Sequence, residues 1–414
     1  MCNRKIALTP FSNFIVIGAG AAGLAAAREL ARAGASVLLL EARERVGGRC
    51  WTRRMPGLPI PVELGAEFVH GEPQVTLSLL KAARIRAVPS VHEQRYLSNG
   101  RLRPIDAFDE AQRAVRGARV DADVSFDAFL ARRRMPEKTR AFARMMVEGF
   151  DAADPKRVSA RSIVEEWAGS SFGESQPRPA GGYGALCDWL AEDIVRRGVR
   201  LRLDAAVSGI RWQRGVVTVR TPRFDAKAAK VIVTLPLGVL QSGPLRFPQK
   251  RAALKRLASG PVIRVAMRFD TAFWEKRAPG VAFFHSPRAL FPTFWTPLPM
   301  RAPLLTAWAG GPKAARLTGL SQRKLISAAL ASVETVFGRA PGLAGAYVQD
   351  WQADACSRGG YSYVLVGGDG AREDLAAPLD EIVFFAGEAT DTEEAGTVAG
   401  ALRSGIRAAR QAIR

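Results

Sequence analysis

The first fifty residues alternate between apolar runs and a helical pattern, which predicts a βαβ unit. Residues 14–17 are Phe-Ile-Val-Ile, a run typical of a strand that is buried on both faces. Residues 24–33 place apolar side chains at helical spacing and precede Gly34, a common helix end. A second apolar run at residues 36–40 ends at Glu41. We therefore expect two parallel strands joined by a helix.

Patterns further along the chain extend this prediction to a larger α/β protein. They predict, in chain order, a mostly helical stretch over 74–180, a helix over 185–195, strands over 199–203 and 216–220, several strands over 251–340, and a helix over 321–337. Within residues 260–270, alternation puts Val262, Arg264, Ala266 and Arg268 on one face of a strand.

Three glycines mark the turn between the first strand and the first helix. Gly18 permits a tight turn, Gly20 lets the backbone approach a pyrophosphate, and Gly23 lets the helix lie close to the strand. The helix N-terminus adds free N–H groups for the phosphates. Glu41 stands where a carboxylate accepts hydrogen bonds from a ribose diol. This context favours a dinucleotide site over a structural turn, but it does not choose between NAD and FAD.

Composition narrows the class of protein. With 414 residues, 48% hydrophobic and 24% charged, the chain suits two or three globular domains and excludes a disordered or collagen-like protein. The four cysteines, Cys2, Cys50, Cys187 and Cys356, form no CxxC motif, so we expect reduced thiols and a cytoplasmic protein. Three scattered histidines give little basis for a metal site or a nucleophilic triad.

The charge balance, 60 Lys and Arg against 39 Asp and Glu, gives a net +21. The arginines are scattered, so we read them as Arg-rich composition and expect no nucleic-acid partner. The longest apolar stretch, residues 14–27, is rich in Gly and Ala, and we expect no transmembrane segment. Near the C-terminus Arg403, Arg407, Arg410 and Arg414 recur at helical spacing, which predicts a solvated face of a core helix or a surface that docks an anionic partner.

The segment after Glu41 favours FAD. Residues 41–49, Glu-Ala-Arg-Glu-Arg-Val-Gly-Gly-Arg, resemble the FAD signature of the flavin amine oxidases, a family that includes monoamine, polyamine and L-amino-acid oxidases and lysine-specific histone demethylases. The resemblance implies that Gly48 lies close to the cofactor. It also implies that Arg49 pairs with the cofactor phosphates, the alternative for Arg49 being a surface salt bridge.

Four more motifs extend the resemblance over nearly the whole chain, at residues 63–71, 231–240, 351–363 and 385–405. It implies an α/β fold in which a Rossmann-like, glutathione-reductase-like FAD-binding domain carries a discontinuous α+β substrate-binding domain. By this analogy the FAD-binding domain comprises 11–72, 181–250 and 345–414, and the substrate-binding domain 73–180 and 251–344. We expect the active site between them.

The resemblance also assigns the cofactor-binding residues. They are Gly18, Gly20, Gly23, Glu41, Arg43, Gly48, Arg49, Gly65, Ala66, Glu67, Val207, Gly387, Glu388, Thr397 and Val398. In the family, the glutamate that matches Glu388 contacts the ribityl and phosphate region of the cofactor. The helix that follows it points its N-terminus at the flavin pyrimidine. Gly360 aligns with the cysteine that attaches flavin covalently in monoamine oxidases, so we expect FAD to bind non-covalently.

Four residues are expected at the reacting end, namely Arg264, Tyr361, His70 and Glu67. His70 matches a substrate-facing histidine of polyamine oxidases, although a structural histidine is the alternative. Tyr361 matches one wall of the family's aromatic cage. The alternative is that Tyr361 is an ordinary core residue. Arg264 replaces the usual lysine that holds a water at flavin N5, so it could hold the same water or bind a substrate carboxylate.

The resemblance implies an oxidoreductase that acts on a small-molecule amine, with polyamine-like substrates favoured. Hydride would pass from the carbon next to a neutral amine to flavin N5, and O2 would reoxidise FAD and form H2O2. Glu67 and His70 would hold the second nitrogen of the substrate. The alternatives are an L-amino-acid oxidase, an FAD-dependent dehydrogenase with another acceptor, and a non-catalytic flavoprotein that binds an anionic partner.

Overall fold

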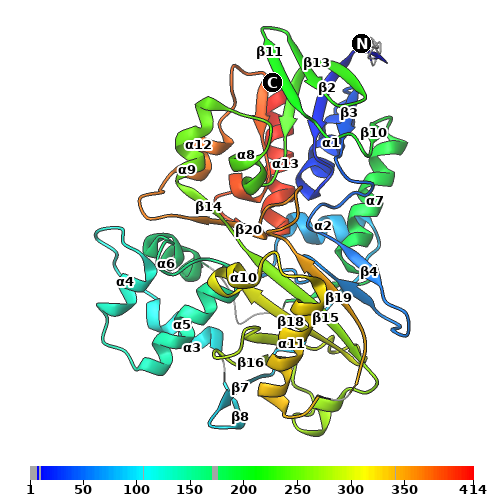
Figure 1. The fold of residues 1–414 in the computed structure, drawn as a ribbon. Coiled ribbons are helices and arrows are strands. Elements are labelled where there is room, and N and C mark those ends of the chain that lie inside the picture. The colour runs from blue at the N-terminus through cyan, green and yellow to red at the C-terminus, as the bar shows by residue number, and fades with distance from the viewer. Residues whose placement is uncertain (1–6, 9–10, 106, 170–175, 341) are drawn as a thin grey trace.

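The structure is a computed structural model that describes residues 7–8, 11–105, 107–169, 176–340 and 342–414. Figure 1 shows two regions: the N-terminal strands and the C-terminal helix share the upper one, and the middle of the chain forms most of the lower one. Cys2 lies outside the described residues, and Cys50, Cys187 and Cys356 are free thiols. None of the described helices is both long enough and apolar enough to cross a membrane.

The upper region is built on a mainly parallel sheet in the order β10-β3-β2-β13-β12-β11, with β1 and β21 also paired to β13. Its strands are β1 (Ala7–Leu8), β2 (Ser12–Ile17), β3 (Val37–Leu40), β10 (Arg200–Arg202), β11 (Gly209–Gln213), β12 (Val216–Arg220), β13 (Phe224–Val233) and β21 (Val383–Phe385). The predicted βαβ unit is present, because β2 and β3 are parallel and are joined by α1 (Ala21–Arg32). The structure therefore confirms the expected α/β class.

Helices cover both faces of this sheet because its central strands are apolar on both sides. On β2, Phe14 and Val16 pack in the core beneath α1, α7 (Gly182–Arg196) and α13 (Val398–Ile413). Ile15 and Ile17 pack in a second core on the opposite face. That face carries α8 (Leu237–Ser242), α9 (Arg251–Lys255) and α12 (Ala371–Ala376). The glycine turn therefore follows a central, buried strand at the carboxyl end of the sheet.

The lower region contains a second, mixed sheet in the order β19-β15-β18-β17-β16-β7-β8. Its strands are β7 (Gln94–Ser98), β8 (Arg101–Pro104), β15 (Val262–Phe269), β16 (Phe283–His285), β17 (Thr293–Trp295), β18 (Leu304–Gly310) and β19 (Leu343–Asp350). The odd-numbered residues of β15 pack in a core with α11 (Gln322–Phe337). The predicted alternation is present, since Arg264 and its even-numbered neighbours face away from this core.

Helices complete the lower region beside this sheet. They are α3 (Ala107–Val115), α4 (Phe126–Ala131), α5 (Glu137–Gly149), α6 (Ala160–Gly169) and α10 (Gly311–Leu317). The helix α2 (Gln74–Ala82), which we grouped with the substrate-binding segments, instead packs Leu79 and Leu80 into the core of the upper region. Three short strand pairs link the parts: β4 (Thr52–Arg54) with β5 (Pro61–Glu63), β6 (Ala87–Val88) with β9 (Arg178–Pro179), and β14 (Leu257–Gly260) with β20 (Tyr361–Val364). The stretch expected to be mostly helical thus also contains β6 to β9, and β7 and β8 join the second sheet. Residues 345–350, which we grouped with the FAD-binding segments, lie in β19 of the second sheet.

The arginines of α13 bind groups of the protein itself. Arg403 forms ion pairs with Asp391 and Glu393, and Arg410 pairs with Glu29 on α1. Arg407 donates to the carbonyl oxygen of Phe385 at 2.9 Å. These contacts favour the core-helix reading of the basic stripe over a docking surface.

Candidate active site

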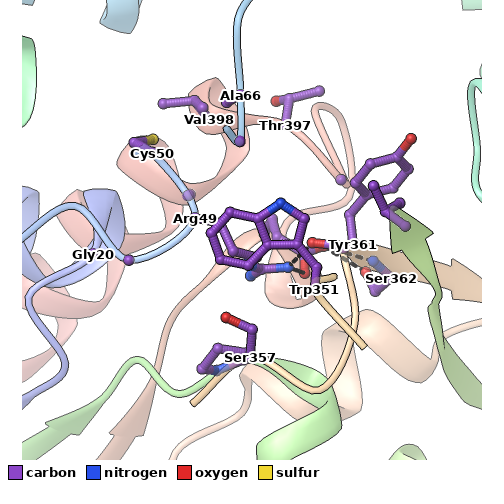
Figure 2. A pocket seen from close by; sticks show the side chains of 18 of the residues that line it. Gly20, Arg49, Cys50, Ala66, Trp351, Ser357, Tyr361, Ser362, Thr397 and Val398 are labelled. Carbon is purple, nitrogen blue, oxygen red and sulfur yellow. Dashed lines mark hydrogen bonds and ion pairs between the residues drawn. The ribbon is translucent and has the colours of Figure 1, made fainter. Parts of the chain in front are cut away.

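A cavity of about 480 Å³ lies between the two regions and brings the predicted residues together. Every predicted cofactor-binding residue lines it except Gly23. Arg264, Tyr361 and His70 line the same cavity, and so do the other two histidines of the sequence, His92 and His285. Segments far apart in sequence therefore form one site (Figure 2).

The glycine turn forms the dinucleotide end. Gly18 adopts φ +102°, which favours glycine, and a Cβ on Gly23 would lie 1.8 Å from the carbonyl oxygen of Gly18. Gly23 therefore acts by letting α1 approach β2, as predicted, although it does not face the cavity. Glu41 accepts backbone N–H groups from Ala19 at 2.7 Å and Arg43 at 2.9 Å, which fixes its carboxylate at the cavity edge.

The N-terminus of α1 fits a pyrophosphate. Its N-cap is Gly20, so no side chain caps the first turn, and that turn carries no acidic residue. The free N–H groups of this turn start at the cavity wall, which Gly20 and Ala21 line. These features fit the phosphates of a dinucleotide cofactor.

Two arginines near the turn are anchored by acidic partners. Arg43 binds Asp354 through both Nη atoms, at 3.0 and 2.6 Å, and also donates to Ser357. Arg49 donates to Glu388 Oε1 at 3.0 Å and to the carbonyl oxygen of Gly360. Arg49 is thus a partly buried member of the cavity wall and not a surface salt bridge.

Glu388 is the centre of a buried network at the cavity wall that includes Arg49 and Ser362, both labelled in Figure 2. Its Oε2 accepts from Ser362 Oγ at 2.6 Å, and Arg372 donates to the same Oγ at 2.7 Å. Burial raises the pKa of Glu388, but Arg49 and Arg372 outweigh that effect and lower it. The carboxylate is therefore ionised and fixed in direction, which suits a group that accepts hydrogen bonds from cofactor hydroxyls.

The N-terminus of α13 also lies at the cavity. Thr397 caps this helix by accepting the N–H of Gly400 at 3.0 Å. Figure 2 shows Thr397, Val398 and Ala66 together above the cavity. The positive end of the helix dipole thus points into the site, where it stabilises negative charge.

At the other end of the cavity, Glu67 lies in a buried cluster with two arginines. Arg178 Nε donates to Oε1 at 2.7 Å, Trp295 Nε1 donates to Oε2 at 2.9 Å, and Arg264 Nη2 also binds Oε2. Burial raises the pKa of Glu67, but Arg264 and Arg178 outweigh it and lower the pKa to about 2. Both carboxylate oxygens already have donors, so Glu67 holds arginines in place.

The two arginines of this cluster are themselves occupied. Arg264 Nη1 donates to the carbonyl oxygen of Gly65 at 2.9 Å, and the guanidinium lies 5.0 Å from the Trp295 ring centroid. Arg178 donates to the carbonyl oxygens of Leu298 at 2.8 Å and Thr296 at 3.1 Å. Arg264 Nε has no partner among the described residues. That atom is a donor of Arg264 that remains for a water or a ligand.

Tyr361 and His70 form part of the wall near Phe150. The Tyr361 hydroxyl donates to the carbonyl oxygen of Phe150, which fixes the ring. The His70 ring meets the Phe150 ring edge-on, with centroids 5.2 Å apart. Burial lowers the pKa of His70 to about 4, so its imidazole is neutral at pH 7. Its Nδ1 has no hydrogen-bond partner among the described residues.

Several residues of the site were not found from the sequence. Trp295, Asp151 and Glu166 line the cavity, and Arg178 binds Glu67 at its wall, all from segments that carry no recognisable local motif. Of these, Arg178 binds Glu67, which is 111 positions away, and no spacing rule predicts such a contact. Among the residues that the structure describes, no cluster of His, Cys, Asp or Glu suits a metal ion.

Curated proteins are similar in sequence to most of this chain. Lysine-specific histone demethylase 2 of Homo sapiens is 28% identical over 95% of this chain, and homolog 3 of demethylase 1 of Arabidopsis thaliana is equally similar. The chain spans only 52% and 29% of the length of those two proteins. Polyamine oxidase 4 of Oryza sativa subsp. japonica is 27% identical over 98% of this chain and 89% of its own length.

Solved structures show the same fold. Putrescine oxidase bound to putrescine superposes with a TM-score of 0.83 at 22% identity, over 98% of this chain and all of that one. Cyclohexylamine oxidase from Brevibacterium oxydans IH-35A gives 0.83 at 22% identity, over 97% of this chain and 99% of its own.

A family model matches residues 21–413, nearly the whole chain. The cofactor is accordingly FAD. Glycine at position 360 offers no thiol for a covalent bond to the flavin. The protein belongs to the flavin containing amine oxidoreductases.

Proposed function

We propose that this protein oxidises polyamine-like amines and passes the electrons to O2, with formation of H2O2. FAD, when bound, accepts a hydride from the carbon next to the amine nitrogen. The product imine then hydrolyses to an aldehyde and an amine. The family supports oxidation of an amine, and the names of the polyamine oxidase and putrescine oxidase relatives support the substrate class.

One observation carries the choice of an amine over an amino acid. The two arginines at the reacting end, Arg264 and Arg178, are both bound to Glu67 and to backbone carbonyl oxygens. A substrate carboxylate would have to displace Glu67, which is buried between them. Removing one member of a buried ion cluster is strongly unfavourable, so we do not retain Arg264 as a carboxylate-binding group.

The residues around the reacting end can orient a neutral amine. Tyr361 offers an aromatic wall that is fixed by its hydrogen bond to Phe150, and Thr397, at the start of α13, lines the same cavity. His70 is neutral and can accept a proton or a hydrogen bond at Nδ1, or donate one in its other tautomer. Arg264 Nε is a buried donor without a partner among the described residues. Glu67 binds Arg264 directly, and Arg178 holds Glu67, so these two residues position Arg264.

The test is anaerobic absorbance spectroscopy of the purified yellow protein. Spermine, spermidine, N-acetylated polyamines, monoamines and L-amino acids are mixed with it in turn, and the flavin band is followed. We expect a polyamine or diamine to bleach the band, and admission of air to restore it with release of H2O2. Bleaching by L-amino acids alone would contradict the proposal, as would a protein that no amine reduces. If air does not reoxidise the reduced flavin, the electron acceptor is not O2.

A further inference from the structure

The cavity extends from the reacting end across one face of the second sheet. It is lined on four neighbouring strands by Arg264 on β15, Trp308 on β18, Thr293 on β17 and His285 on β16. Each of these residues is the register partner of the next. Neighbouring strands lie about 4.8 Å apart, so the three steps place the backbone of His285 roughly 14 Å from that of Arg264. The cavity therefore has room for an elongated molecule.

Strand alternation directs the side chains at the far end toward the cavity. Phe284 and Phe294, the alternate residues on β16 and β17, pack in the core on the opposite face of the sheet. His285 is buried, and Thr293 is half-buried. His92, just before β7, lines the same end of the cavity and is exposed, so this end opens to the surface.

Three polar side chains that line this end, Gln94, His285 and Thr293, form a hydrogen-bonded cluster. His285 Nε2 lies 2.8 Å from Gln94 Oε1, and His285 Nδ1 lies 3.3 Å from Thr293 Oγ1. Because an amide oxygen only accepts hydrogen bonds, His285 Nε2 carries a proton and is the donor to Gln94. The Gln94 amide nitrogen makes no hydrogen bond to another described residue, so its N–H groups remain for a ligand.

This cluster offers hydrogen-bond donors but no negative charge. The acids among the described lining residues are Glu41, Glu67, Asp151, Glu166 and Glu388, and none of them belongs to β7, β16 or β17. Glu93, next to Gln94 in the sequence, forms an ion pair with Arg95 and does not line the cavity. An ammonium group at the cluster would therefore meet N–H donors without a counter-ion, whereas a carbonyl oxygen would accept from the Gln94 amide.

We propose that the Gln94–His285–Thr293 cluster binds a neutral secondary amide at the far end of an elongated substrate, while the amine that is oxidised lies at the reacting end. The inference rests on the proposed function and narrows its substrate to an amine with a long, N-acylated tail. Trp295 and Trp308 line the cavity between the two ends, with ring centroids 5.6 Å apart. Their apolar surface suits the methylene chain that joins the amine to the amide.

The experiment measures the apparent Kd of four amines by anaerobic stopped-flow reduction of the FAD-loaded protein. The amines are octane-1,8-diamine, butane-1,4-diamine and the mono-N-acetyl derivative of each. The eight-carbon chain brings its amide near the cluster, and the four-carbon chain falls short of it. In the unmodified protein we expect acetylation to lower the Kd of the eight-carbon amine by about 10-fold, because it replaces an unpaired charge with an accepted hydrogen bond. The four-carbon amine should show no such gain.

Two variants test the residues of the cluster. Gln94→Leu has a similar size and no amide, so it should reduce the gain of the eight-carbon amine about 3- to 10-fold, the range for one neutral hydrogen bond. Thr293→Val removes the hydroxyl group beside His285 and should act in the same direction. The matched control is Gln213→Leu, because Gln213 is an exposed glutamine on β11 that does not line the cavity. It should leave all four Kd values unchanged.

The chain lengths separate the proposed subsite from the proposed function. An equal effect of acetylation on both chain lengths would overturn the subsite and leave amine oxidation intact, as would a gain that Gln94→Leu preserves in full. If the variants do not fold, the length dependence in the unmodified protein still decides. If none of the amines reduces the flavin, the proposed function fails and the subsite fails with it.

Discussion

Glu63 is a buried carboxyl group that lies outside the cavity and responds to pH. It accepts the N–H of Tyr183 at 2.6 Å and the hydroxyl of Thr52 at 2.9 Å. Burial raises its pKa from 4.5 to about 7, because these donors and the more distant Arg264 do not compensate for the loss of water. The ionised form is thus disfavoured in the folded state.

This position gives a prediction about stability. Because the folded pKa is raised, the contribution of Glu63 is complete below about pH 4.5 and is lost as the pH rises toward about 7. Glu63→Gln keeps a neutral acceptor there, so it should stabilise the protein at pH 8 by up to about 3 kcal/mol. Chemical unfolding of both proteins at pH 5 and pH 8 measures this, and a variant that is equally destabilised at both values would contradict it.

The pKa of Glu67 is shifted in the opposite direction, so its effect on stability has the opposite pH dependence. Its pKa is lowered to about 2, so its contribution to stability is present above about pH 4.5 and is lost as the pH falls toward 2. Glu67→Gln leaves Arg264 and Arg178 buried without their shared anion, which should cost about 3–5 kcal/mol at pH 7. Glu334→Gln, at an exposed site on α11, is the control and should change little. Thermal unfolding at pH 7 is the measurement, and equal melting temperatures would contradict this role.

At the scale of elements, the contact between α1 and α13 couples the two termini of the chain to the cofactor site. Both helices begin at the cavity, α1 after Gly20 and α13 after Thr397. They pack closely, because a Cβ on Gly405 would lie 2.1 Å from the carbonyl oxygen of Ala22. A shift of either helix would therefore move an N-terminus that lies at the cavity, where FAD would bind.

Gly405→Ala tests this coupling. The added methyl group must push α13 from α1, at a cost of about 1–3 kcal/mol, and we expect FAD affinity to fall about tenfold. Gly209→Ala is the control, because its Cβ would meet only Arg220 Cβ at 3.7 Å. Fluorescence titration of the apoprotein with FAD measures the affinity. Unchanged affinity in Gly405→Ala would show that the helix contact does not position the cofactor site.

Local patterns predicted the elements around the cofactor well. The strands of the βαβ unit, the strand at 216–220 and the helix from residue 322 lie where the spacing placed them, within one or two residues at their ends. The helix α1 begins three residues before the predicted start, because small Ala and Gly residues in its first turn mask the apolar period. The strands β7 and β8 were missed because they are short and rich in Arg and Gln.

The substrate side could be predicted less well because its contacts are long-range. Arg264 was placed on the correct face of its strand, but its partner Glu67 could not be inferred, since 197 residues separate them. Asp151 and Glu166 line the same cavity, although one lies in the loop after α5 and the other in α6. Buried charge pairs of this kind depend on tertiary packing, which no local period encodes.

At the scale of the whole molecule, the net charge of +21 opposes the approach of a cationic substrate. Screening shortens the Debye length from about 30 Å at 0.01 M salt to about 8 Å at 0.15 M. We therefore expect kcat/KM for a diamine to rise over this range, and to rise more than for a monoamine. Steady-state rates at several salt concentrations measure this. A fall in kcat/KM with salt would show that local acidic groups, and not the net charge, govern encounter.

The central claim is that the cavity accepts an amine, because the two described arginines at the reacting end, Arg264 and Arg178, are both bound to Glu67 and are not available to a carboxylate. The most direct measurement is anaerobic reduction of the flavin by putrescine and by ornithine, which is putrescine with one added carboxylate. With Arg264 and Arg178 both bound to Glu67, the account predicts fast reduction by putrescine and at least about 100-fold slower reduction by ornithine at equal concentration, the scale expected when an unpaired charge must be buried. Equal or faster reduction by ornithine would contradict it.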